Sequence, residues 1–138
     1  MNLLNKIQPE WALRLGIGVM YLYSGQDLIR SPRAWIWALP YWLRQMISGV
    51  ISVDVYLRIQ GGVEIIMALV FFAWFLKPTL VKWIALLSTL EMAGILVLAF
   101  LPWSENNFLI TFRDIGLLGG SLALFLLLTS KSENSVVQ

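Results

Sequence analysis

Two acidic residues stand in the middle of long apolar stretches, where charged side chains are rare. Glu64 lies in the stretch over residues 53–76, and Glu91 lies in the stretch over residues 81–101. Because a charge at the centre of a bilayer costs at least about 2.5 kcal/mol, we expect at least one of these carboxyl groups to be protonated at rest. A protonated carboxyl group can donate a hydrogen bond to a bound quinone head group or pass on a proton, which makes both residues candidate catalytic residues. It can equally serve only as a hydrogen-bonded contact between two helices.

Five further ionisable residues fall inside apolar stretches: Arg14, Asp27, Arg58, Arg113 and Asp114. Since buried charges are paired, we expect a buried ionic network in which the arginines and aspartates face one another. At about 1.5 Å per helical residue, Arg58 and the Arg113-Asp114 pair lie about 7–9 Å from one membrane boundary. Asp27 lies at a similar depth near the same boundary. We therefore predict that Asp27, Arg58, Arg113 and Asp114 form an ionic layer. Arg14 lies near the opposite face, where its side chain is expected to extend toward the lipid head groups.

Two residue types are missing, and their absence excludes whole classes of chemistry. The sequence has no cysteine, which excludes disulfides, thiolate catalysis, iron–sulfur clusters and structural zinc sites built from this chain. It has no histidine, which excludes bis-histidine haem and most transition-metal sites and removes the most common general base. We therefore expect no metal site and no covalently bound cofactor. Any redox role requires a diffusible carrier or the cofactor of a partner.

The composition is that of an integral membrane protein. Of the 138 residues, 59% are hydrophobic and 13% are charged, whereas soluble domains carry about 25% charged residues. The mean hydropathy is +0.76, so much of the apolar surface must face lipid or a partner. The net charge of +2 is too small to indicate a nucleic-acid partner. We expect the lipid bilayer to be the main partner.

Four stretches are long enough to cross a bilayer, which takes about 20 apolar residues. They cover residues 11–29, 53–76, 81–101 and 108–129, and a polar tail follows at 130–138. The connections after the second and third stretches are short, so successive helices are expected to be antiparallel neighbours. The sequence therefore predicts a single all-α domain over residues 1–138, a transmembrane four-helix bundle.

The connection between the first two stretches, over residues 33–50, is too interrupted to cross a membrane and too aromatic to be a solvated loop. We predict a partly helical, Trp-rich segment that lies in the membrane interface. Indole rings collect at membrane boundaries. On that basis we assign the interfacial anchors to Trp35, Trp37, Trp42, Trp83 and Trp103.

The lysines indicate the orientation. With four crossings, both termini and the connection near residue 77 share one side, and this side carries Lys6, Lys77, Lys82 and Lys131. The other side carries Arg30, Arg33 and Arg44. By the positive-inside rule we expect a multi-pass protein of the inner (plasma) membrane with both termini in the cytoplasm.

Small residues share helical stripes with the charges, which indicates that the charged faces pack closely against neighbouring helices. The stripes are formed by Arg14, Gly18, Tyr21 and Gly25, by Gly61, Glu64 and Ala68, and by Arg113, Gly116 and Gly120.

Several short motifs also follow one another in a familiar order and spacing. They are Arg14-Leu15-Gly16, Tyr23-Ser24-Gly25, Gly61-Gly62-Val63-Glu64, and Arg113-Asp114 with Gly119-Gly120. Together they resemble the DoxX/DoxD family of small four-helix membrane proteins, over about residues 11–128. The sequence differs at Gln26-Asp27, where family members commonly have a lysine soon after the Ser-Gly pair, and in its Trp-rich connection. The positions that match the family are Arg14, Glu64, Arg113 and Asp114.

The resemblance implies a role beside a membrane oxidoreductase. DoxD-like members are subunits of a thiosulfate:quinone oxidoreductase, and DoxX-like members are associated with membrane oxidoreductase assemblies linked to sulfur or oxidative stress. We therefore expect a subunit of a quinone-linked oxidoreductase complex, with quinone as the candidate ligand and other membrane or membrane-associated subunits as partners. Whether this chain is itself an enzyme stays open.

Two alternatives remain at this stage. The chain could be a non-catalytic structural or assembly subunit of a larger membrane complex, in which the charges only specify packing. It could also be a small proton-coupled transporter that uses Glu64 and Glu91, although four crossings would then favour a dimer.

Overall fold

A computed structural model describes residues 8–100 and 105–134, with the side chains described for residues 8–98 and 114–131. Within these ranges the chain is all-helical, which confirms the expected all-α class. The helices in chain order are α1 (Pro9–Arg30), the 3-10 helix η2 (Pro32–Ala38), α2 (Tyr41–Ser48), α3 (Val53–Phe72), α4 (Pro78–Phe100) and α5 (Glu105–Asn134).

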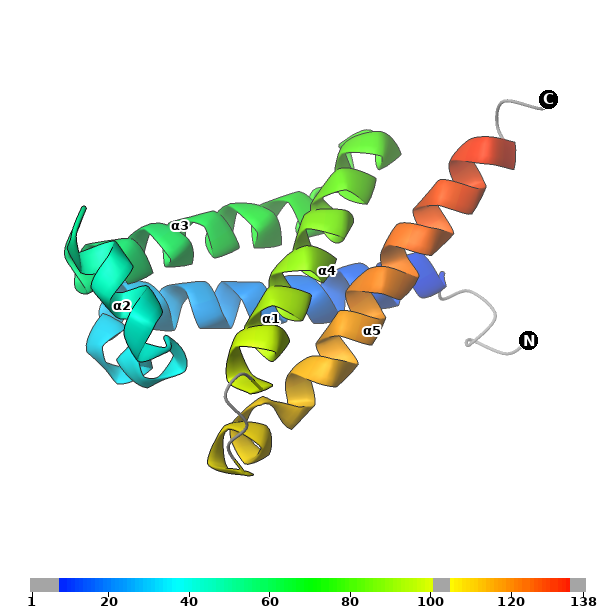
Figure 1. Ribbon diagram of the computed structural model, residues 1–138. Coiled ribbons are helices and arrows are strands. Elements are labelled where there is room, and N and C mark those ends of the chain that lie inside the picture. Colours follow the sequence, from blue (N-terminus) through cyan, green and yellow to red (C-terminus); the bar gives the residue numbers. More distant parts are fainter. Residues whose placement is uncertain (1–7, 101–104, 135–138) are drawn as a thin grey trace.

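The four long helices form two pairs. Helix α1 lies along α3, and α4 lies along α5, while contacts between the pairs are fewer and involve mainly α1 with α5. The α4–α5 pair crosses the α1–α3 pair obliquely, and η2 and α2 cover one end of the α1–α3 pair (Figure 1). The core lies where the pairs cross and takes side chains from all four long helices, among them Tyr21, Phe71, Ala85 and Leu124.

Local sequence explains where the helices begin. Helix α1 begins with Pro9 and Glu10. Proline is well tolerated in the first turn because the backbone N–H groups there have no partner within the helix, and the negative charge of Glu10 interacts favourably with the positive end of the helix dipole. Helix α3 is capped by Ser52, whose hydroxyl oxygen accepts a hydrogen bond from the Val55 amide at 3.3 Å. Helix α4 begins at Pro78. Each of these three starts therefore lies where the chain supplies a capping residue or a proline.

Two helix ends differ from the predicted boundaries. Helix α3 ends at Phe72 rather than at residue 76, because Ala73 has an extended backbone conformation. Helix α5 continues to Asn134, into the segment predicted as a polar tail. The hydroxyl groups of Thr129 and Ser130 donate to backbone carbonyls of the preceding turn, which keeps this polar segment compatible with a helix.

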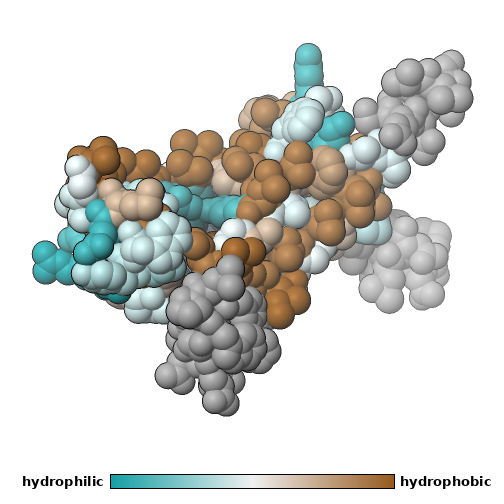
Figure 2. Space-filling view, viewed as in Figure 1, coloured by the Kyte–Doolittle hydropathy of each residue, from teal (hydrophilic) through white to brown (hydrophobic). Residues whose placement is uncertain are grey.

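Three helices are long and apolar enough to cross a membrane within the part of the chain that the structure describes: Val53–Phe72, Pro78–Leu98 and Asp114–Lys131. Large apolar side chains such as Ile66, Leu90 and Leu126 are exposed on them. Figure 2 shows apolar side chains over much of the surface, above all over α4 and α5, whereas more polar side chains gather near η2 and α2. The protein is therefore a multi-pass membrane protein in a lipid environment.

The predicted packing stripes are confirmed on α1 and α3. A Cβ atom added to Gly25 would lie 2.6 Å from the Gly61 carbonyl oxygen, and one added to Gly61 would lie 2.6 Å from the Gly25 carbonyl oxygen. The two backbones thus approach so closely that only glycine fits at both positions. Glu64 and Ala68 continue the buried stripe on α3.

The predicted stripe on α5 is wrong at Gly116, whereas Gly120 is half-buried next to Leu13 of α1 and the side chain of Arg113 lies outside the described ones. Gly116 is exposed, and a Cβ atom added there would meet nothing within 4 Å. Helix α5 buries a different face, formed by Ser121, Leu124 and Leu128. Large side chains rather than glycines therefore fill the contacts of α5.

Candidate functional site

A cavity of about 650 Å³ lies between the two helix pairs, and every helix contributes to its wall. Most of the lining is apolar, as at Leu57, Met92 and Ile95. The polar part of the wall is supplied mainly by α1, α3 and α4, through Tyr21, Ser24, Gln60, Glu64 and Glu91. An apolar cavity with a few convergent polar groups is the usual form of a small-molecule site.

Glu91 is fully engaged by groups from the other helix pair. The Tyr21 hydroxyl lies 2.7 Å from its Oε2 and 2.9 Å from the Ser88 hydroxyl oxygen. Because a phenol has one proton, Tyr21 donates in one of these hydrogen bonds and accepts in the other. The Gln60 amide donates to the other carboxyl oxygen, Oε1. Both oxygens of Glu91 are thus held, and the hydrogen bonds join α4 to α1 and to α3.

Glu64 is held differently. Its side chain is 5% exposed, and Ser24 and Gln60 lie within hydrogen-bonding reach of its carboxyl group. Its Oε2 atom, however, is buried without a hydrogen-bond partner among the described residues. An unsatisfied buried polar atom costs about 1–3 kcal/mol and calls for an explanation. Glu64 therefore retains hydrogen-bonding capacity in the wall of the cavity.

The structure places both glutamates singled out from the sequence in the wall of one cavity. Gln60 and Ser88 belong to the same hydrogen-bonded site but were not predicted from the sequence. Each lies about one helical turn before one of the two glutamates, Gln60 before the buried Glu64 and Ser88 before the half-buried Glu91. Polar residues at this spacing on an apolar helix share a face with the carboxyl group, and that is the signal that could have found them.

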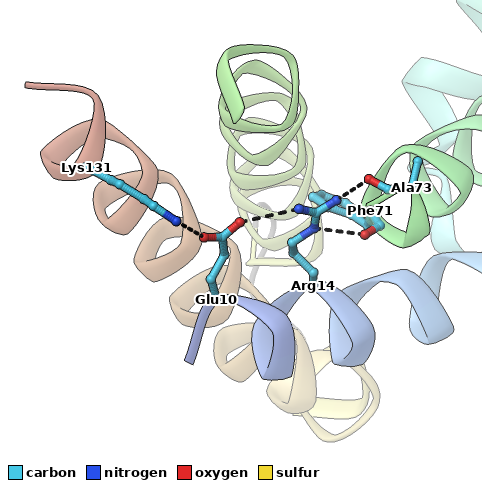
Figure 3. A network of polar contacts seen from close by, with 5 residues as sticks. All are labelled: Glu10, Arg14, Phe71, Ala73 and Lys131. Atoms are coloured by element: carbon cyan, nitrogen blue, oxygen red, sulfur yellow. Dashed lines mark hydrogen bonds and ion pairs between the residues drawn. The ribbon is translucent and has the colours of Figure 1, made fainter. Parts of the chain in front are cut away.

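Arg14 forms a second buried polar centre, near the ends of three helices (Figure 3). Its Nε donates to the Phe71 carbonyl oxygen at 2.9 Å, and its Nη2 donates to the Ala73 carbonyl oxygen at 2.6 Å. Its Nη1 pairs with Glu10 at 3.3 Å, and Glu10 also pairs with Lys131 at 3.2 Å. The guanidinium group also lies 4.1 Å from the centre of the Trp11 ring.

The expected extension of Arg14 toward lipid head groups is therefore wrong. The side chain is 4% exposed and satisfies carbonyl groups that the last turn of α3 leaves without helical partners. Its role is to bind the end of α3 to the start of α1.

The predicted ionic layer does not form among the residues whose side chains are described. Asp27 accepts a hydrogen bond from the Trp35 indole at 2.8 Å. Arg58 is exposed, so its expected burial in a network is wrong. Asp114 lines the cavity. The side chain of Arg113 lies outside the described ones.

The tryptophans divide into two groups. Trp35 and Trp37 stack with ring centres 6.3 Å apart and line the cavity, so they do more than anchor the chain at an interface. Trp42 and Trp83 are exposed, as anchors would be. Trp103 lies outside the described residues, and the position of η2 and α2 relative to a membrane stays a prediction.

Comparison of the chain with protein-family models, with curated proteins and with solved structures finds no match. The resemblance to the DoxX/DoxD family therefore stays a prediction. Over residues 8–98 and 114–131, no group of three or more acidic, histidine or cysteine side chains could hold a metal ion.

Proposed function

We propose that this chain is a four-crossing membrane protein that binds a quinone head group in its central cavity and serves as a subunit of a quinone-linked oxidoreductase complex. The observation that carries the proposal is the unpartnered carboxyl oxygen of Glu64 in the wall of a mostly apolar cavity. A quinone ring is flat and apolar and carries carbonyl oxygens that accept hydrogen bonds. A protonated Glu64 can donate one such bond while the apolar side chains contact the ring.

The size and lining of the cavity fit this ligand. Small-molecule sites commonly measure about 300–1,000 Å³, and this cavity measures about 650 Å³. The aromatic side chains of Trp35 and Tyr56 contribute to the wall. When bound, quinone supplies the redox chemistry that a chain without cysteine and histidine lacks.

The chain's own contribution is to hold the head group and a proton. Gln60 contacts the carboxyl groups of both Glu64 and Glu91. Glu91 in turn contacts Tyr21, and Tyr21 contacts Ser88. Tyr21, Ser88, Glu91 and Gln60 thus form one hydrogen-bonded set that spans three helices, and Glu64 lies next to Gln60 with one oxygen left for a ligand.

The placement of charges on α1 supports a fourth crossing. This helix has 22 residues, which gives a length of about 33 Å and is enough for the hydrocarbon core. Glu10 and Arg30 lie at its two ends, Arg14 is buried, and Asp27 is bonded to Trp35. None of these four charges therefore has to face lipid in mid-membrane.

The ion pair between the first turn of α1 and the end of α5 supports an even number of crossings. Lys131 lies 3.2 Å from Glu10, so the start of α1 and the end of α5 lie next to each other, which supports a location on the same side of the membrane. Lys77 lies at the α3–α4 connection, which an even number of crossings places on that same side. The positive-inside rule then favours the cytoplasm for both termini.

The test is quinone content after purification of the full chain in mild detergent. We expect extractable quinone in the wild-type protein and about tenfold weaker binding of added quinone in Glu64→Leu, since one lost hydrogen bond is worth about 1–1.5 kcal/mol. Glu64→Gln keeps a donor and should still bind, but it cannot release a proton in turnover by the complex.

A second variant tests the cavity without touching the carboxyl groups. Gly94 lines the cavity and has nothing within 4 Å of an added Cβ atom, so Gly94→Leu should fill space and exclude the ligand. Gly119 is equally open but does not line the cavity, which makes Gly119→Leu the matched control. Wild-type protein that neither contains nor binds quinone would overturn the proposal. Partner subunits without quinone would then indicate a scaffold, and uptake into proteoliposomes a carrier.

A further inference from the structure

A second, smaller pocket of about 250 Å³ lies where α1, η2 and α3 meet. Its lining is formed by Arg30, Ser31, Pro32, Arg33, Ala34, Asp54 and Arg58. None of these residues lines the central cavity. The pocket is therefore a separate site, and what it binds does not depend on the function proposed above.

The pocket carries an excess of positive charge. It contains three arginines and one aspartate, and that aspartate is already used, because Arg33 Nε donates to Asp54 Oδ2 at 3.1 Å. Arg30 and Arg58 form no ion pair with any residue in the described parts of the chain. Two guanidinium groups therefore share one small concave site without a counter-charge.

The position of Arg58 makes this excess costly in the absence of a ligand. The residue lies six positions after the cap Ser52 on α3, a helix apolar enough to cross a membrane. At about 1.5 Å per residue this places it about 9 Å along the helix, from where a side chain as long as that of arginine can reach the lipid head groups. An unpaired arginine at this depth favours an anionic partner.

Arginine also selects the kind of anion. Its planar guanidinium group offers several N–H donors in a fixed geometry that matches the oxygens of a phosphate group, often through two parallel hydrogen bonds. The Ser31 hydroxyl in the same pocket adds a further donor. The combination fits a tetrahedral oxyanion better than a single carboxylate.

We propose that the pocket formed by Arg30, Arg33 and Arg58 binds a phosphate group, and that its source in the membrane is the head group of an anionic phospholipid. The lipid phosphate supplies the missing counter-charge at the level where the pocket lies. Bound there, it joins the end of α1, the start of η2 and the first turns of α3.

The test uses the full chain in a neutral detergent and measures binding of phosphatidylglycerol by native mass spectrometry and by the midpoint of thermal unfolding. Since an arginine near a membrane surface contributes about fivefold to the affinity for anionic lipid, we expect about fivefold weaker binding in Arg30→Gln and in Arg58→Gln. The double variant should bind about 25-fold more weakly. Diacylglycerol with the same acyl chains, which lacks the phosphate, should not compete.

Two controls separate this site from general electrostatics and from misfolding. Lys77→Gln removes one positive charge at the opposite end of α3 and should leave binding unchanged. Arg30→Lys with Arg58→Lys keeps the charge but removes the forked geometry, and it should bind with an affinity between those of the wild-type protein and the double glutamine variant.

The outcomes are distinguishable. If inorganic phosphate alone raises the unfolding midpoint, and the double glutamine variant loses this effect, the phosphate site is supported with a free anion as its source. Phosphatidylglycerol binding that is unchanged in the double glutamine variant would overturn the proposal, and so would binding of diacylglycerol with equal affinity.

Discussion

Arg14 and Glu64 are equally buried in the same helix pair, yet their hydrogen-bonding capacity is used in opposite ways. Arg14 donates to two backbone carbonyls and pairs with Glu10. Glu64 keeps one buried oxygen without a partner among the described residues and lies in the wall of the central cavity. Burial alone therefore does not separate a structural charge from a functional one. The two kinds of charge differ in whether other groups of the protein supply all the hydrogen bonds that the buried side chain can form.

The largest expected effect comes from removing the satisfied charge. Arg14→Leu leaves the Phe71 and Ala73 carbonyls without their donors, and Glu10 loses one of its two partners. Breaking one partner of a buried charged contact typically costs about 3–5 kcal/mol. We expect the free energy of unfolding in detergent to fall by about this amount.

Glu64→Leu is the contrasting variant, and it should change stability by less than about 1 kcal/mol, because relief of the unsatisfied oxygen offsets the lost contacts with Ser24 and Gln60. Equal losses in the two variants would contradict the comparison.

An intermediate effect is expected at the backbone contact that positions Glu64. In Gly61→Ala the new Cβ atom would lie 2.6 Å from the Gly25 carbonyl oxygen, so α1 and α3 must separate. Overpacking of this kind costs about 1–3 kcal/mol, and quinone binding should weaken as the cavity wall shifts. Gly62→Ala, one position along, has nothing within 4 Å and should instead gain up to about 1 kcal/mol from helix propensity. Both values can be read from the same unfolding titration in detergent.

The smallest effect is expected at the edge of the Arg14 centre. The Lys131 side chain is 64% exposed, so its pair with Glu10 is largely solvated. Exposed ion pairs contribute about 0–1 kcal/mol. Lys131→Gln should therefore leave the unfolding midpoint nearly unchanged and lose its small effect at high salt. A loss as large as that of Arg14→Leu would show that Glu10 rather than Arg14 is the central residue of this centre.

The sequence predicted much of the fold because membrane helices leave strong patterns. The predicted stretch from residue 53 begins where α3 begins, whereas α1 and α4 begin two and three residues before the predicted starts, at Pro9 and Pro78. The close approach of α1 and α3 follows from Gly25 and Gly61 on stripes shared with charges. On α5, Gly116 and Gly120 show the same spacing, but a Cβ atom added to Gly116 would meet nothing within 4 Å and one added to Gly120 would only touch the Leu13 side chain at 4.0 Å. Spacing identifies a face of a helix, but it does not show which neighbour, if any, covers that face.

The partners of the buried charges were harder to predict. Arg14 binds backbone carbonyls, which every residue carries, so no sequence pattern marks them. Asp27 binds the indole of Trp35 rather than an arginine, because η2 folds back along α1 and brings that ring within reach. Depth along a helix was sufficient to place Glu64 and Glu91 at one level, but it could not show that Gln60 joins them.

Helix η2 separates the two pockets, with Trp35 and Trp37 toward the central cavity and Pro32 and Arg33 toward the arginine-rich pocket. The seven residues of η2 thus form a wall that the central cavity and the arginine-rich pocket share. If a ligand in one pocket shifts η2 and thereby changes the affinity of the other pocket for its own ligand, thermodynamic linkage requires that the second ligand change the affinity for the first by the same factor. The lipid composition of the surrounding bilayer and the occupancy of the interior would then be two readouts of one equilibrium.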